Sequence, residues 1–135
     1  MLPIISIYVS GTLTILMALI HTRYYKMFNW KSEFEKISPV NSRIFYTIHI
    51  ALLILFFLIG ILLIAYAKEL SKGVGLSAGL NTLLFIFWLW RFIWQFTYFK
   101  RKKGQKLPLI VVLLSTIFAL LCISHFIPLL YRFLS

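Results

Sequence analysis

Residues 87–96 read FWLWRFIWQF, and this stretch decides the class of fold. Eight of its ten residues are large and apolar or aromatic, and they belong to an apolar run at 75–99. Three further apolar runs cover residues 3–20, 44–67 and 107–134. Each run has roughly the 20 residues that a helix needs to cross about 30 Å of hydrocarbon. The sequence therefore predicts membrane-spanning helices.

The overall composition supports the same class of fold. Of the 135 residues, 61% are hydrophobic and the mean hydropathy is +0.94, which is more apolar surface than a soluble domain of this size can hide from water. We expect a single all-α membrane domain over residues 1–135, a polytopic four-transmembrane-helix bundle. The expected spans are 3–22, 43–67, 74–99 and 107–132, with a short interfacial helix at 33–37.

The basic residues are distributed unevenly along the chain. Lys and Arg number 14 against 3 acidic residues, and most of them fall in two connections, 23–43 and 100–106. The positive-inside rule makes both connections cytoplasmic, which places both termini outside a multi-pass inner (plasma) membrane. The cluster KRKK at 100–103 lacks the aromatic residues of a nucleic-acid module. Anionic lipid head groups are therefore its expected partners, and nucleic acid is not.

Local signals set the expected helix ends and helix packing. Pro39 is expected to end the interfacial helix, and Asn41 or Ser42 to cap the second span. Gly75 and Gly79 form a G-x-x-x-G pattern, which predicts a close approach of the third span to a neighbouring helix. One face of the first span carries small residues that predict packing against another helix: Ser6, Ser10, Thr14 and Ala18.

Arg91 is the unusual residue of the decisive stretch. It lies about 13 Å along a helix from Lys100, and a charge deep in the membrane costs ~2.5–3.5 kcal/mol. Helical side chains tilt toward the N-terminus of their helix, which here leads away from the nearer, cytoplasmic surface. We therefore expect Arg91 to face the bundle interior. One stripe at i, i+3 and i+4 spacing contains Asn81, Leu84, Trp88, Arg91, Gln95 and Tyr98.

The acidic residues of the sequence are expected to lie far from Arg91. Glu33 and Glu35 are in the first connection, and Glu69 is in the second. The expected partners of Arg91 are neutral groups, or an anion from outside the chain. A phosphate, a fatty carboxylate or a haem propionate would accept two parallel hydrogen bonds from the planar guanidinium. A packing or insertion role is the competing interpretation.

Two histidines are expected at a depth similar to that of Arg91. His21 and His49 are candidates to line one polar pocket in the cytoplasmic half, together with Arg91 and Gln95. The expected apolar walls of this pocket are Trp88, Trp94 and Tyr25. Both histidines are also explained by a hydrogen bond to a hydroxyl or carbonyl group, or by axial ligation of a b-type haem.

Two polar residues are expected nearer the outer surface. Asn81 counts among the candidate ligand-binding residues because it shares the stripe of Arg91, although an interhelical hydrogen bond is the simpler explanation. His125 is expected to be an interfacial residue of the other leaflet.

Catalysis has little support in the sequence. The spans contain no pair of carboxylates, and there is no nucleophile elbow, Gly-rich phosphate loop or HExxH motif. The lack of an intramembrane Asp or Glu also argues against proton-coupled transport. The primary interpretation is an accessory or ligand-binding membrane protein without catalysis of its own, whose pocket takes an anionic amphipathic ligand or lipid. A redox protein carrying b-type haem or quinone is the alternative, and an oligomeric channel or transporter is a second one.

The segment HTRYYKMFNW at 21–30 resembles a signature of small bacterial four-helix membrane proteins of unknown function, which are loosely similar to DoxX-type proteins. The resemblance covers the four-span layout and five residues at the end of the first span: His21, Tyr24, Met27, Phe28 and Trp30. Some DoxX-type proteins are associated with membrane electron transfer, so the resemblance favours the redox alternative. Of the candidate site residues it covers His21 alone.

Overall fold

The computed structural model describes residues 1–98 and 108–134, and it confirms an all-α membrane protein. Within these residues, four helices are long and apolar enough to cross a membrane: α1 (Leu2–Met27), α3 (Pro39–Ala65), α5 (Leu76–Thr97) and α6 (Leu109–Leu134). Two short helices, α2 (Trp30–Glu35) and α4 (Ala67–Leu70), connect them. The expected basic connection at 100–106 and residue 99 of the third span lie outside the described residues.

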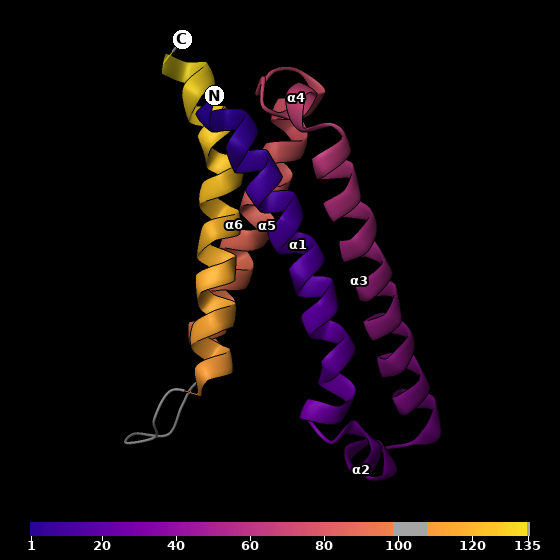
Figure 1. Ribbon diagram of the computed structural model, residues 1–135. Helices are drawn as coiled ribbons and strands as arrows, with labels where there is room; N and C mark the ends of the chain where they lie inside the picture. Colours follow the sequence, from indigo (N-terminus) through magenta and orange to yellow (C-terminus); the bar gives the residue numbers. More distant parts are fainter. Residues whose placement is uncertain (99–107, 135) are drawn as a thin grey trace.

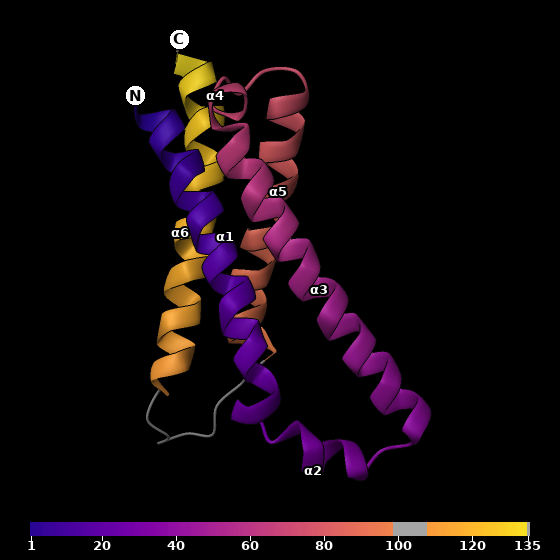
Figure 2. The same ribbon diagram turned by 45° about the vertical axis from the view of Figure 1, so that its right-hand side comes forward.

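The helices form two pairs that are joined at one end. Helix α1 packs along α3, α5 packs along α6, and the main contact between the two pairs is that of α1 with α6. Both termini and α4 lie at the same end, which we call the terminal end, whereas α2 lies at the opposite end (Figure 1). Toward this α2 end, α3 diverges from α5 and α6 in both views (Figures 1 and 2). The bundle is therefore closed at the terminal end and splayed at the α2 end.

Helices α1 and α3 approach each other closely at Gly11 and Gly60. A Cβ atom added to Gly60 would lie 2.5 Å from Ile15 Cγ1 and 3.0 Å from the Gly11 carbonyl oxygen. The expected approach at the G-x-x-x-G pattern is wrong, because a Cβ atom added to Gly75 or Gly79 would meet nothing within 4 Å among the described residues. Gly75 instead has a φ of 53°, which suits the turn before α5.

The start of α3 differs from the expected one. Ser38 is the N-cap, and its hydroxyl oxygen accepts a hydrogen bond from the Asn41 backbone N–H at 3.3 Å. Pro39 opens the helix, because a first-turn residue makes no use of its N–H and the proline ring already fixes a helical φ. The expectation that Asn41 or Ser42 would cap this helix is therefore wrong, and α3 begins before the expected boundary at residue 43.

Helix α1 and the short helix α2 also have shifted boundaries. Helix α1 continues to Met27, beyond the expected end at residue 22. Asn29 then turns the chain with a left-handed φ of 49°, which asparagine tolerates better than most residues. Helix α2 follows immediately at Trp30–Glu35, earlier than the expected 33–37, and none of its residues is fully buried.

The glycine contact provides a test of the α1–α3 pair. We expect Gly60→Leu to lower the free energy of unfolding by about 1–3 kcal/mol, since its side chain would force the two helices apart. The matched control is Gly79→Leu, whose side chain would enter open space. Thermal unfolding in mild detergent measures both variants. Equal melting temperatures for the two variants would contradict the assigned helix crossing.

Candidate functional site

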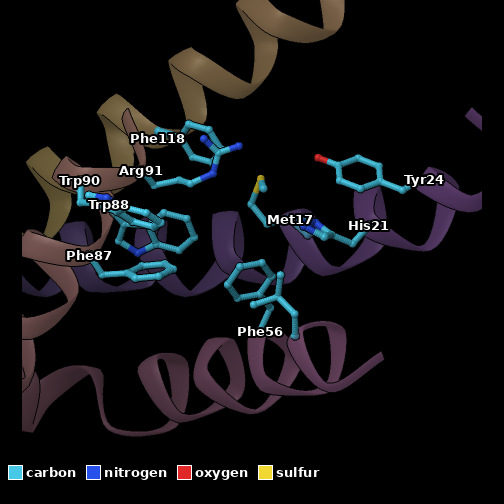
Figure 3. Close-up of a pocket in the computed structure, with 10 residues that line it drawn as sticks. Met17, His21, Tyr24, Phe56, Phe87, Trp88, Trp90, Arg91 and Phe118 are labelled. Carbon is cyan, nitrogen blue, oxygen red and sulfur yellow. The ribbon is translucent and has the colours of Figure 1, made fainter. Parts of the chain in front are cut away.

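A cavity of about 320 Å³ lies between the two helix pairs (Figure 3). This volume is at the lower end of the range found for small-molecule sites. Its polar lining consists of His21 and Tyr24 from α1 and Arg91 from α5, with the indole of Trp88 beside them. The apolar lining comes from all four long helices: Met17, Leu52, Phe56, Phe87, Trp90 and Phe118.

Arg91 points between the two helix pairs, as the stripe on α5 predicts. Its guanidinium carbon lies 4.7 Å from the centroid of the Phe118 ring, in cation–π geometry. Figure 3 shows the Tyr24 hydroxyl on the other wall of the cavity, directed toward the guanidinium. A positive charge and a hydroxyl group thus face one cavity from opposite helix pairs.

His21 lies beside Tyr24 on the α1 wall of the cavity. Its Nδ1 is 2.8 Å from the Met17 carbonyl oxygen. A carbonyl oxygen only accepts hydrogen bonds, so Nδ1 must carry a proton and donate it. In the neutral ring Nε2 is then an acceptor. The imidazole is 4.4 Å from the Tyr24 ring and meets Phe56 edge-on at 5.2 Å, measured between ring centroids.

His49 does not line this cavity but lies behind its wall. Its ring centroid is 5.9 Å from that of His21 and 6.2 Å from that of Tyr24. Trp30 of α2 meets His49 edge-on at 4.7 Å, which connects the short helix to the back of the cavity wall. Over residues 1–98 and 108–134, no group of three or more His, Cys, Asp or Glu side chains is placed to hold a metal ion.

The other three candidate residues of α5 lie at different positions along the helix, and only one of them lines the cavity. Trp88 is 2% exposed and stacks between Phe56 and Phe118, with ring centroids 5.6 and 5.9 Å away. Gln95 is buried on the same helix but is not among the residues lining the cavity, and Asn81 lies in the terminal half. Of the six candidate ligand-binding residues, the structure therefore places His21, Trp88 and Arg91 on the cavity.

Two of the expected walls are replaced by near neighbours in the sequence. Tyr24 lines the cavity in place of Tyr25, and Trp90 in place of Trp94. Tyr25 instead meets Trp30 and Phe34. Tyr24 belongs to the aromatic segment at the end of the first span, but the sequence carries no signal for which of the two adjacent tyrosines faces α5. Phe118 is one of many apolar residues in its span, and nothing in the sequence distinguishes it as a cavity residue.

A second polar cluster occupies the terminal half of the bundle. Ser10 Oγ lies 2.6 Å from His125 Nε2, and Asn81 Oδ1 lies 3.0 Å from His125 Nδ1. The Asn81 amide nitrogen donates to the carbonyl oxygens of Leu70 and Ser77 at 2.8 and 2.9 Å. Asn81 Oδ1 must therefore accept a hydrogen bond from the N–H at His125 Nδ1, and the neutral imidazole accepts a hydrogen bond at Nε2 from the Ser10 hydroxyl. We call Ser10, His125 and Asn81 the terminal clasp.

The terminal clasp corrects the expectation for His125 and bears out the simpler explanation of Asn81. His125 is 0% exposed and hydrogen-bonded on both sides, so its assignment to the membrane interface is wrong. Asn81 makes the interhelical hydrogen bond that was the simpler explanation of its position. The order of the three groups resembles a nucleophile, base and orienting residue. However, Ser10 is also 0% exposed, so no substrate reaches its hydroxyl in this conformation.

Comparisons of the chain with protein-family models, with curated proteins and with solved structures found no match. The resemblance of residues 21–30 to DoxX-type proteins therefore stays a prediction.

The terminal clasp is tested by a double-mutant cycle. We expect His125→Leu to cost about 1–3 kcal/mol of unfolding free energy for each buried polar group left without its partner. Ser10→Ala combined with His125→Leu should cost less than the sum of the single changes, because both remove the same hydrogen bond. Thermal unfolding in detergent measures each variant, with Thr22→Ala, at an exposed hydroxyl, as control. Strictly additive effects would contradict a shared hydrogen bond.

Proposed function

We propose that this protein is a membrane component without catalysis of its own, which binds an anionic amphipathic lipid in the cavity between its helix pairs. The observation that carries the proposal is Arg91 on the wall of a mainly apolar cavity, opposite Tyr24 and beside Phe118. This combination of one permanent charge and apolar surface matches a molecule with an anionic head and a hydrocarbon tail.

The polar lining supports an anionic head. A guanidinium offers several N–H donors in a planar fork that suits phosphate and carboxylate oxygens. The Tyr24 hydroxyl can add a further donor from the opposite wall. None of the three acidic residues of the chain lines the cavity, so no carboxylate there repels an anion. Because the surroundings are poorly solvated, each of these contacts is stronger than it would be in water.

The apolar lining supports a lipid tail. Phe56, Phe87 and Trp90 present aromatic surface to the cavity. Trp90 is 49% exposed, so it also reaches the outer surface of the bundle. Side chains of α3 and α5 both line the cavity, so a lipid that enters between these helices would reach it from the bilayer without passage through water. A soluble anion would gain little from these aromatic walls.

The proposal includes an orientation for the protein. Five basic residues lie in the connection at the α2 end or beside it: Arg23, Lys26, Lys31, Lys36 and Arg43. Together with the basic segment 100–106, they favour a cytoplasmic α2 end, with both termini outside the inner membrane. The cavity would then take its ligand from the cytoplasmic leaflet, where anionic lipids attract basic residues.

Native mass spectrometry of the protein released from mild detergent tests the proposal. We expect wild-type protein to retain an anionic lipid, and Arg91→Leu to reduce retention by more than about tenfold because charge-assisted hydrogen bonds are lost. Arg91→Lys should retain part of the binding, since it keeps the charge without the fork. Arg23→Leu is the matched control, because it removes an exposed arginine outside the cavity.

Two results would overturn this proposal. If Arg91→Leu and Arg23→Leu retain lipid equally, retention reflects general attraction to head groups. If the purified protein shows a Soret band and no bound lipid, the haem-binding redox alternative replaces the lipid proposal.

A further inference from the structure

The polar groups of the cavity belong to two helix pairs, which meet on the cavity wall through the stacked rings of Phe56 on α3 and Trp88 on α5. Arg91 is carried by α5, which packs on α6, whereas His21 and Tyr24 are carried by α1, which packs on α3. Figure 3 shows these side chains approaching the cavity from opposite sides. A single anion that contacts both walls would therefore connect the two pairs.

At the terminal end, hydrogen bonds hold α1, α5 and α6 together. The Ser10–His125 hydrogen bond joins α1 to α6, and the Asn81–His125 hydrogen bond joins α5 to α6. The loop before α5 also fits closely against α6, because a Cβ atom added to Gly73 would lie 2.5 Å from the Pro128 carbonyl oxygen. We therefore expect movement of one pair against the other at the α2 end, beyond the Phe56–Trp88 contact.

The α2 end of α3 packs on α1 and α2, whereas α3 makes few contacts with α5 and α6. Ile44, Phe45 and Ile48 are 52%, 59% and 61% exposed, and His49 is the one buried residue of α3 before Phe56. Trp30 of α2 packs on His49, so α2 is attached to the α1–α3 pair. Little protein packing therefore opposes a change in the distance between this part of α3 and α5.

We infer that ligand binding regulates the shape of the cavity: an anionic lipid head held by Arg91 and Tyr24 draws the α2 ends of the two pairs together, while the terminal clasp stays in place. This inference rests on the proposed lipid site. A ligand shifts a conformational equilibrium by its difference in affinity between the two states. In the closed state, with the α2 ends together, Arg91 and Tyr24 both contact the same head group. In the open state one of these two side chains is farther from it, so the ligand favours the closed state.

Electron–electron distance measurement between spin labels tests this inference. Labels are attached through Ile48→Cys on α3 and Ile93→Cys on α5, two positions that are 61% and 51% exposed. A control pair, Ile61→Cys and Leu83→Cys, reports on the terminal half with 55% and 61% exposed positions. The native Cys122 is replaced by alanine in both pairs. Each protein is placed in nanodiscs of phosphatidylcholine alone or with phosphatidylglycerol.

Phosphatidylglycerol should shorten the Ile48–Ile93 distance by about 2–5 Å, the scale of helix shifts in ligand-driven transitions. The control distance should stay constant, and Arg91→Leu should remove the shortening. If wild-type protein retains the anionic lipid in native mass spectrometry but the distance does not change, the closure is wrong while the lipid site stands. If phosphatidylglycerol shortens the Ile48–Ile93 distance equally in the Arg91→Leu variant, the bilayer and not the cavity drives the change, and the inference is also wrong. If no lipid is retained, both proposals fail together.

Discussion

The hydrogen bond between the Ser10 hydroxyl and the His125 imidazole is the interaction on which the rest of this structure depends. Hydrocarbon offers no water to satisfy buried polar groups, so they must be paired within the protein. Here the pairing continues through Asn81 to two backbone carbonyls, and it draws α1, α5 and α6 together at one end of the molecule. From that end, which is held by directional bonds, α3 diverges from α5 and α6, and the cavity lies between the two helix pairs.

Arg91 and the terminal clasp represent two different ways of placing polar groups in a membrane. The clasp residues satisfy one another and are fully or almost fully buried. Arg91 carries a charge whose insertion costs ~2.5–3.5 kcal/mol, and cation–π contact with Phe118 offsets part of this cost. Its helix, α5, is also the least apolar of the four spans. The chain thus concentrates its insertion penalty in one helix, which is inserted beside three strongly apolar ones.

The fold class was predictable because hydropathy and length are properties of each span alone. The inward direction of Arg91 followed from helical periodicity for the same reason. Helix partners were not predictable in this way, because periodicity identifies a face but not the helix that covers it. For that reason the close approach was assigned to Gly79 and is found at Gly60. His125 was placed at the interface because its hydrogen-bond partner lies at the other end of the chain, and Tyr24 could not be distinguished from its neighbour.

The sequence separation of the terminal clasp has a consequence for biosynthesis. Ser10 and His125 are 115 residues apart, and α6, which carries His125, leaves the ribosome after the other three described spans. At about 5–20 residues per second, roughly 6–23 s pass between synthesis of the two residues. During this interval α1 lies in the translocation apparatus or the bilayer, and the face that carries Ser10 is not yet covered by α6. The nascent chain is therefore exposed to mispairing with foreign helices until α6 arrives.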